Sequence, residues 1–151
     1  MGAVAPQHIK SFYPMKIVSA CLLGINCKYD GGNNRNEKII SLLKDEILIP
    51  VCPEQLGGLS TPRSPSEIRG DRVYSVEGED LTENFKRGAE EVLKIAKLYR
   101  IKEAIFKDGS PSCGVNYIYD GTFKGVRIKG KGITTRLLER EGVRVISEKD
   151  I

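Results

Sequence analysis

Histidine is almost absent from this sequence of 151 residues, whose single histidine is His8. It lies in the first 14 residues, a stretch without clear periodicity that precedes a second methionine, Met15. We interpret residues 1–14 as an N-terminal extension outside the core and residues 15–151 as one domain. Because the domain then contains no imidazole, a Ser-His-Asp triad, a Cys-His pair and a histidine-ligated metal are all excluded from it.

Long apolar runs are also absent. No stretch approaches the roughly 18 apolar residues that would span a bilayer, and the N-terminus lacks the apolar segment of a secretory signal. We therefore expect a cytoplasmic protein that does not enter a membrane. The 24 basic and 20 acidic side chains give a net charge of only +4, and the basic residues are scattered, so charge alone does not favour nucleic-acid binding.

The four cysteines are Cys21, Cys27, Cys52 and Cys113, and no two of them form a C-x2-C pair. The common zinc-ribbon patterns are therefore missing, and a chain of this size does not need disulfides to fold. A single cysteine is most often a small buried apolar residue. The positions of these cysteines after predicted strands, however, favour a functional role.

Three of the cysteines follow short apolar runs that predict buried strands: Cys21 after Lys16–Ala20, Cys52 after Ile47–Val51, and Cys113 in the loop after Glu103–Phe106. The carboxyl ends of parallel strands share one edge of a sheet, and that edge carries the ligand crevice in open α/β folds. The three thiols are thus predicted to meet there, although they lie far apart in the sequence.

The remaining pattern alternates helices with strands. Apolar periodicity predicts helices over 35–46, 81–100 and 133–141 and a fourth strand over 143–146. Residues 71–76 and the polar turn 77–79 are expected to form a small hairpin or lid. The segment 52–67 contains three prolines and is expected to be a rigid loop that lines the site. This order predicts a single three-layer α/β domain with a mainly parallel, Rossmann-like sheet.

Thiolates without histidine favour zinc, copper(I) or an iron–sulfur cluster. Zinc held by all four cysteines would be a closed structural site, whereas a cluster held by three thiolates leaves one iron open to substrate. We assign Cys21, Cys52 and Cys113 as ligands because they terminate strands, and Cys27 as a supporting residue. Glu54, two residues after Cys52, is the candidate proton donor or base. Ser110 is a candidate for orienting a substrate, or else only stabilises its turn.

Several motifs together resemble one family. They are Ser19-Ala-Cys-Leu-Leu-Gly24, Cys27-Lys-Tyr-Asp-Gly31, Cys52-Pro-Glu54, Pro62-Arg-Ser-Pro65, Ser110-Pro-Ser-Cys-Gly114 and Tyr119-Asp-Gly-Thr-Phe123. In this order they resemble the thiouracil desulfidase family from about Met15 to the C-terminus. One departure is Asp108-Gly109, where a basic residue is commoner in the family.

The resemblance implies an oxygen-sensitive [4Fe-4S] cluster held by three cysteines, with one iron that the protein does not ligate. That iron takes the sulfur of a thiolated pyrimidine, and hydrolysis leaves uracil and hydrogen sulfide without net redox change. The implied substrate is a free base, nucleoside or nucleotide. Intact RNA is disfavoured because relatives that act on thiolated RNA carry a further domain.

Two other hypotheses stay open at this point. The chain could be a structural zinc protein with four cysteine ligands, or a module that binds a small ligand or RNA without catalysis. Tyr117, Tyr119 and Phe123 fit both stacking on a pyrimidine and packing in the core. We expect a monomer or a homodimer.

Overall fold

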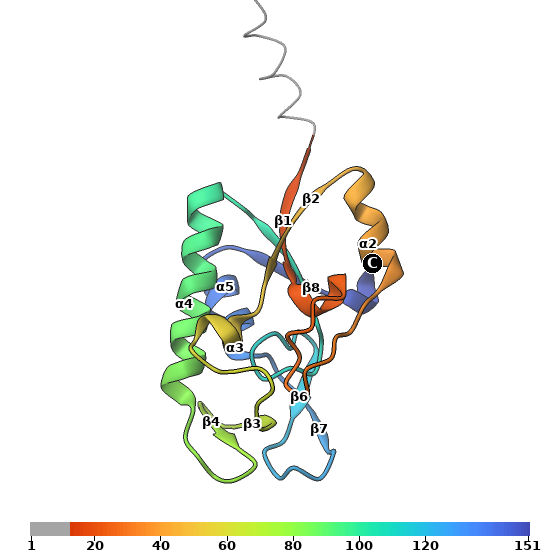
Figure 1. Cartoon of the computed structure of the whole chain (residues 1–151). Coiled ribbons are helices and arrows are strands. Elements are labelled where there is room, and N and C mark those ends of the chain that lie inside the picture. The colour runs from red at the N-terminus through yellow and green to blue at the C-terminus, as the bar shows by residue number, and fades with distance from the viewer. Residues whose placement is uncertain (1–12) are drawn as a thin grey trace, which may run out of the picture.

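The computed structural model describes residues 13–151 and is built on a four-stranded parallel sheet in the order β2-β1-β5-β8 (Figure 1). The strands are β1 (Met15–Ser19), β2 (Ile47–Val51), β5 (Glu103–Phe106) and β8 (Arg144–Ser147). Every neighbouring pair runs parallel. Their aliphatic runs suit strands that are covered on both faces. The predicted parallel α/β fold is therefore confirmed.

Alternating residues of β1 show the three layers. Ile17 packs in a core cluster with Val92 and Leu138 from α4 (Thr82–Tyr99) and α5 (Ile133–Arg140). Its neighbour Val18 packs on the opposite face with Ile39 of α2 (Glu37–Ser41), together with the short 3-10 turn η1 (Ala20–Leu23). Figure 1 shows α4 and α5 on one side of the sheet and α2 on the other.

The helix expected over 35–46 is shorter than its pattern suggested. It begins after Asn36, whose side-chain oxygen accepts hydrogen bonds from the backbone N–H groups of Lys38 and Ile39 at 3.0 and 3.2 Å. It tightens into a 3-10 turn, η2 (Leu42–Lys44), before β2. The N-cap thus sets where the helix begins, since it satisfies N–H groups that have no partner inside the helix.

The proline-rich segment 52–67 is not a loop throughout, which corrects the sequence-based expectation. It opens with the single-turn helix α3 (Pro53–Leu56), and Pro53 stands at a first position where no backbone N–H is required. The turn lies directly on α4, because a methyl group added at Gly88 would overlap the carbonyl oxygen of Pro53, and one at Gly57 the carbonyl oxygen of Asn84.

Two hairpins extend from the carboxyl edge of the sheet (Figure 1). The first joins β3 (Ser66–Arg69) to β4 (Arg72–Ser75), so the hairpin expected over 71–76 begins earlier than predicted. The second joins β6 (Tyr117–Tyr119) to β7 (Arg127–Lys129), two strands that the sequence patterns did not predict. The Glu67 carboxylate accepts hydrogen bonds from the backbone N–H groups of Gly121 and Phe123, which ties one hairpin to the other.

The chain closes with a 3-10 turn, η3 (Glu148–Asp150). His8 and most of the predicted N-terminal extension lie outside the described residues, while the carbonyl of Pro14 already accepts a hydrogen bond from Ile47 at 2.9 Å. Within residues 13–151, no helix has the length and apolar character needed to cross a bilayer.

Candidate active site

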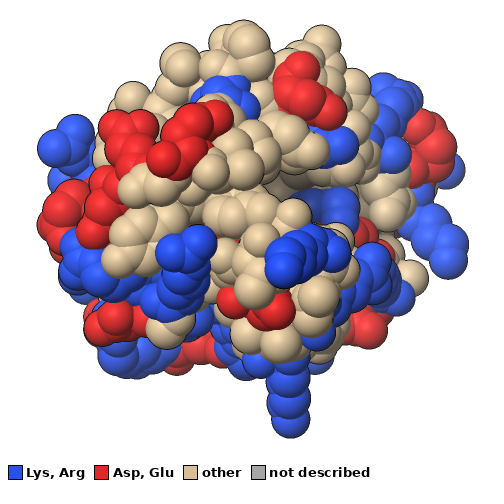
Figure 2. Space-filling model, turned by 90° about the horizontal axis from the view of Figure 1, so that it is seen from below, with Lys and Arg blue, Asp and Glu red and all other residues tan. Residues whose placement is uncertain are grey.

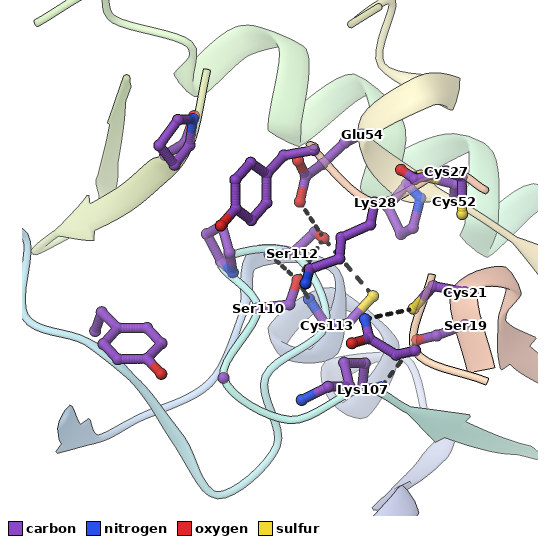
Figure 3. Close-up of a pocket in the computed structure, with 18 of the residues that line it drawn as sticks. Ser19, Cys21, Cys27, Lys28, Cys52, Glu54, Lys107, Ser110, Ser112 and Cys113 are labelled. Atoms are coloured by element: carbon purple, nitrogen blue, oxygen red, sulfur yellow. Dashed lines mark hydrogen bonds between the residues drawn. The ribbon is translucent and has the colours of Figure 1, made fainter. Parts of the chain in front are cut away.

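A cavity of about 570 Å³ opens at the carboxyl edge of the sheet, between the strand ends and the two hairpins. All four cysteines line it, together with Glu54 and Ser110 (Figure 3). None of the four thiols is in a disulfide. The structure therefore brings every sequence-predicted site residue to one place.

The cysteines reach the cavity by different routes. Cys21 lies in η1 just after β1, and Cys52 follows β2 directly as the residue before α3. Cys113 lies well beyond the end of β5, so the prediction that it terminates this strand is wrong. It returns to the sheet edge because the carboxylate of Asp108 accepts hydrogen bonds from the backbone N–H groups of residues 115, 116 and 117 at 2.9–3.2 Å.

Each of the three proposed ligands has a side-chain donor close to its sulfur. The Asn34 amide lies 3.4 Å from Cys21 Sγ, the Ser112 hydroxyl 3.6 Å from Cys113 Sγ, and the Arg63 guanidinium 4.0 Å from Cys52 Sγ, at the outer limit of a hydrogen bond to sulfur. Cys27 differs, since it meets Cys52 through its backbone: the Cys52 thiol donates a hydrogen bond to the Cys27 carbonyl oxygen at 3.7 Å. Donors around three sulfurs favour their thiolate forms, the forms that bind metal.

The pKa values of the thiols differ for physical reasons. Burial raises the pKa of Cys113 to about 12 and also raises that of Cys21. The interaction between the side chains of Cys27 and Cys52 lowers the pKa of Cys52 and raises that of Cys27. Since ligands must be deprotonated to bind, a metal at this site would displace protons from the buried thiols.

The spacing of the thiols bears on the kind of metal centre. In the described part of the chain, no three His, Cys, Asp or Glu side chains come close enough to hold a single metal ion. A closed four-cysteine zinc site needs all its ligands around one ion. An iron–sulfur cluster is larger and is held by thiolates on separate irons, so it does not need all of its ligands around one ion.

Glu54 projects from α3 into the cavity and has a partner on each carboxylate oxygen. Arg63 Nε donates to Oε1 at 2.9 Å, and the Ser112 hydroxyl donates to Oε2 at 3.0 Å. The Ser110 and Ser112 hydroxyls are 3.0 Å apart, so Ser110, Ser112 and Glu54 form one hydrogen-bonded chain (Figure 3). The one Ser112 proton serves either Glu54 or the Cys113 sulfur at a given moment.

Sequence reasoning missed two residues of this arrangement. Ser112 links Ser110 to Glu54, although its neighbour Ser110 was the candidate. Arg63 stood only within the Pro62–Pro65 motif, with no role assigned. The sequence did offer a signal for Arg63: it is a basic residue between prolines, in a segment that also carries Cys52 and Glu54. No local pattern, however, predicts which groups its side chain contacts.

The outer wall of the cavity is aromatic and basic. Tyr117, Tyr119 and Phe123 line it, and the rings of Tyr117 and Tyr119 meet edge to face with centroids 6.1 Å apart. The guanidinium of Arg127 and the ammonium of Lys149 lie 4.3 and 4.6 Å from the Tyr117 ring centroid. Figure 2 shows Lys and Arg side chains around the hollow on this face of the molecule. Both cations are thus placed for cation–π contacts with the Tyr117 ring.

This fold and cavity define a class: an α/β protein whose cysteines converge at the carboxyl edge of a parallel sheet, the kind of site that holds a thiolate-ligated metal centre. The model of the 2-thiouracil desulfurase family matches residues 17–150. The chain therefore belongs to this family, and the resemblance noted in its motifs is confirmed.

Two known proteins show the same likeness. The uncharacterized protein YbbK of Bacillus subtilis (strain 168) is 43% identical over 147 residues, which cover 91% of this chain and 97% of that protein. Among solved structures, the [4Fe-4S]-dependent thiouracil desulfidase TudS matches with a TM-score of 0.87 and 43% identity, covering 91% of this chain and 93% of that one. The likeness thus extends over nearly the whole of each protein.

Proposed function

We propose that this protein hydrolyses the C–S bond of a thiolated pyrimidine, converting thiouracil and water to uracil and hydrogen sulfide. The observation that carries the proposal is the set of three donor-supported thiols, Cys21, Cys52 and Cys113, beside Glu54 in one cavity. Family membership supports it, as does the 43% identity to TudS, which is described as a [4Fe-4S]-dependent thiouracil desulfidase.

The cofactor of this reaction would be a [4Fe-4S] cluster held by Cys21, Cys52 and Cys113, with one iron free of protein ligands. When bound, it supplies a soft Lewis acid that prefers the thiocarbonyl sulfur of the substrate to the carbonyl oxygen of the product. Cys27 supports the ligand set from outside, because its backbone carbonyl accepts hydrogen bonds from the Cys52 thiol at 3.7 Å and from Arg63 at 2.8 Å.

Glu54 is the proton-transfer group in this proposal. Water adds to the ring carbon that carries sulfur, Glu54 accepts a proton from it, and a proton is later returned to the departing sulfur, which leaves as hydrosulfide. Oxygen replaces sulfur at the same carbon, so no electrons are gained or lost. Ser112 holds one carboxylate oxygen at 3.0 Å, and Ser110 orients the ring or stabilises developing negative charge.

The substrate in this proposal is a small thiolated base, nucleoside or nucleotide rather than intact RNA. A cavity of about 570 Å³ is in the size range of small-molecule sites. Tyr117, Tyr119 and Phe123 would provide the surface against which the pyrimidine lies. Stacking of this kind tolerates different substituents on the base.

The deciding experiment is anaerobic purification, followed by iron, zinc and sulfide analysis and an assay of sulfide release from 2-thiouracil and 4-thiouracil. We expect iron and inorganic sulfide in equal amounts, and turnover of at least one substrate. A colourless protein with one zinc per chain would instead establish the zinc hypothesis. An intact cluster that binds thiouracil without turnover would establish a binding module.

Variants then separate ligands from catalytic groups. Cys21→Ser, Cys52→Ser and Cys113→Ser should lose the cluster, whereas Cys27→Ser should retain it. Glu54→Gln and Ser110→Ala should keep the cluster and lose turnover, for Glu54→Gln by about 10²-fold or more, the usual contribution of a general base. Parent-like turnover of Glu54→Gln across pH would remove Glu54 from the mechanism.

A further inference from the structure

We propose that Arg63 is the positioning residue of this site, holding Glu54 in the orientation that reaches Ser112 while its guanidinium supports the Cys52 sulfur. This inference rests on the proposed function and assigns a role to a residue that it did not use. Arg63 lies between Pro62 and Pro65 and outside any helix or strand. The position of its side chain therefore depends on the contacts that the side chain makes.

The guanidinium of Arg63 uses all five of its N–H groups. Its side chain is only 9% exposed. The partners come from three segments of the chain: Glu54 Oε1 at 2.9 Å, the Ser60 carbonyl at 3.1 Å, the Thr61 hydroxyl at 2.8 Å, the Cys27 carbonyl at 2.8 Å and the Cys52 sulfur at 4.0 Å. A lysine has three donors on a single nitrogen and cannot reproduce this planar arrangement.

The contact with Glu54 decides where that carboxylate points. The Glu54 side chain is 14% exposed, and its two oxygens are held by Arg63 on one side and Ser112 on the other. If the guanidinium were removed, a largely buried carboxylate would lose its charged partner and turn toward water, because an unpaired charge in such a place is costly. Its hydrogen bond to Ser112 would then be lost as well.

The same side chain joins the two loops that carry Cys27 and Cys52. The guanidinium of Arg63 donates a hydrogen bond to the Cys27 carbonyl, and the backbone N–H of Arg63 donates one to the Tyr29 carbonyl at 2.8 Å. The loops are thus tied together through Arg63. Arg63 therefore contacts the Glu54 carboxylate and the Cys52 sulfur and also fixes the position of the loops. An exposed surface ion pair differs, since it contributes little to stability.

The experiment compares anaerobically purified holoenzyme of the parent, Arg63→Lys, Arg63→Gln and the control Arg144→Gln. Arg144 is an exposed arginine that pairs with Glu103 at the far end of the sheet. Four quantities are measured: iron and sulfide content, KM and kcat for the thiouracil that the parent turns over, and the reduction potential of the cluster.

We expect both Arg63 variants to keep the cluster, with a similar KM and a kcat lowered by about 10²-fold, the cost of misplacing a catalytic group by about 1 Å. The reduction potential should become more negative in Arg63→Gln, because hydrogen bonds and positive charge near a cluster sulfur raise it. In Arg63→Lys the potential should stay near the parent value while kcat is still low. Arg144→Gln should match the parent in every quantity.

The outcomes separate this inference from the function on which it rests. A parent holoenzyme that releases no sulfide would overturn the proposed function. An active parent with parent-like kcat in Arg63→Gln would overturn the role of Arg63 alone. Loss of the cluster from both Arg63→Lys and Arg63→Gln would make Arg63 a residue needed for cluster retention, and would equally contradict its role in positioning Glu54.

Discussion

Asp108 shows how one residue shapes the loop that carries a proposed ligand. Its side chain is buried, and its Oδ1 accepts the backbone N–H groups of residues 109, 115, 116 and 117, while Oδ2 accepts the Asn116 amide at 2.8 Å. Burial acts to raise the pKa of Asp108, but these hydrogen bonds outweigh it and lower the pKa to about 2. Asp108 thus folds the Ser-Pro-Ser-Cys loop back onto the sheet edge.

The substitution Asp108→Asn should therefore destabilise the protein at neutral pH by about 2 kcal/mol, the free energy that corresponds to the pKa shift. Because the folded-state pKa lies below the ordinary value of 3.8, the contribution is fully present above about pH 4 and is lost as the pH falls towards 2. Urea unfolding of parent and variant between pH 7 and pH 2 measures it. The exposed Asp71→Asn serves as the control, and an equal gap between parent and Asp108→Asn at all pH values would contradict this account.

At the scale of elements, the contact between α3 and α4 places Cys52 and Glu54. Gly57 and Gly88 allow the two backbones to meet without an intervening side chain. The side-chain amide of Asn84 in α4 also donates to the Gly57 carbonyl at 2.9 Å, which adds a polar contact to the close packing. A helix of a single turn has little stability of its own, so its position depends on this contact.

Gly88→Ala should displace α3 and with it Cys52 and Glu54. We expect a loss of stability of roughly 1–3 kcal/mol, as for other overpacked contacts, together with lower cluster content and lower turnover. Thermal unfolding and iron analysis of the anaerobic protein test both effects. Glu90→Ala, on the exposed side of α4, is the matched control, and an unchanged iron content in a destabilised Gly88→Ala would show that α3 does not depend on this packing.

At the scale of the whole molecule, the two ends of the sheet have different roles. The central strands β1 and β5 are almost fully buried through Ile17, Val18 and Ile105 and form the core. The carboxyl edge instead gathers four free thiols, a carboxylate and hydroxyl groups around a cavity. Such an edge is expected to depend on a bound group for part of its stability, because a ligand that binds only the folded state stabilises it.

Removal of iron by an anaerobic chelator should therefore lower the melting temperature. It should also speed amide hydrogen exchange in η1, α3 and the loop 107–114, while β1 and β5 stay protected. Exchange measured by mass spectrometry on the two forms tests this. Equal exchange at the cavity edge with and without iron would show that the protein alone holds the site in shape.

Local sequence patterns are sufficient to predict the core of the fold. The bounds of β2 and β5 agree with the predicted strands, and β1, α4 and α5 differ from their predictions by one or two residues. These elements follow from local apolar runs and periodicity, which can be recognised in the sequence without knowledge of tertiary contacts. The convergence of Cys21 and Cys52 was also predictable, because parallel strands present their carboxyl ends at one edge. The return of Cys113 to that edge depends on the hydrogen bonds of Asp108.

The assembly of the site depends on contacts between residues that lie far apart in the sequence. The hydrogen bond between Ser112 and Glu54 joins residues 58 positions apart, and that between Arg63 and the Cys27 carbonyl spans 36 positions. The second hairpin likewise forms because β6 pairs with β7. The aromatic, glycine-broken sequence of this segment has no strand pattern of its own. Contacts of this kind depend on where the core places each loop, and no local spacing of residues contains that information.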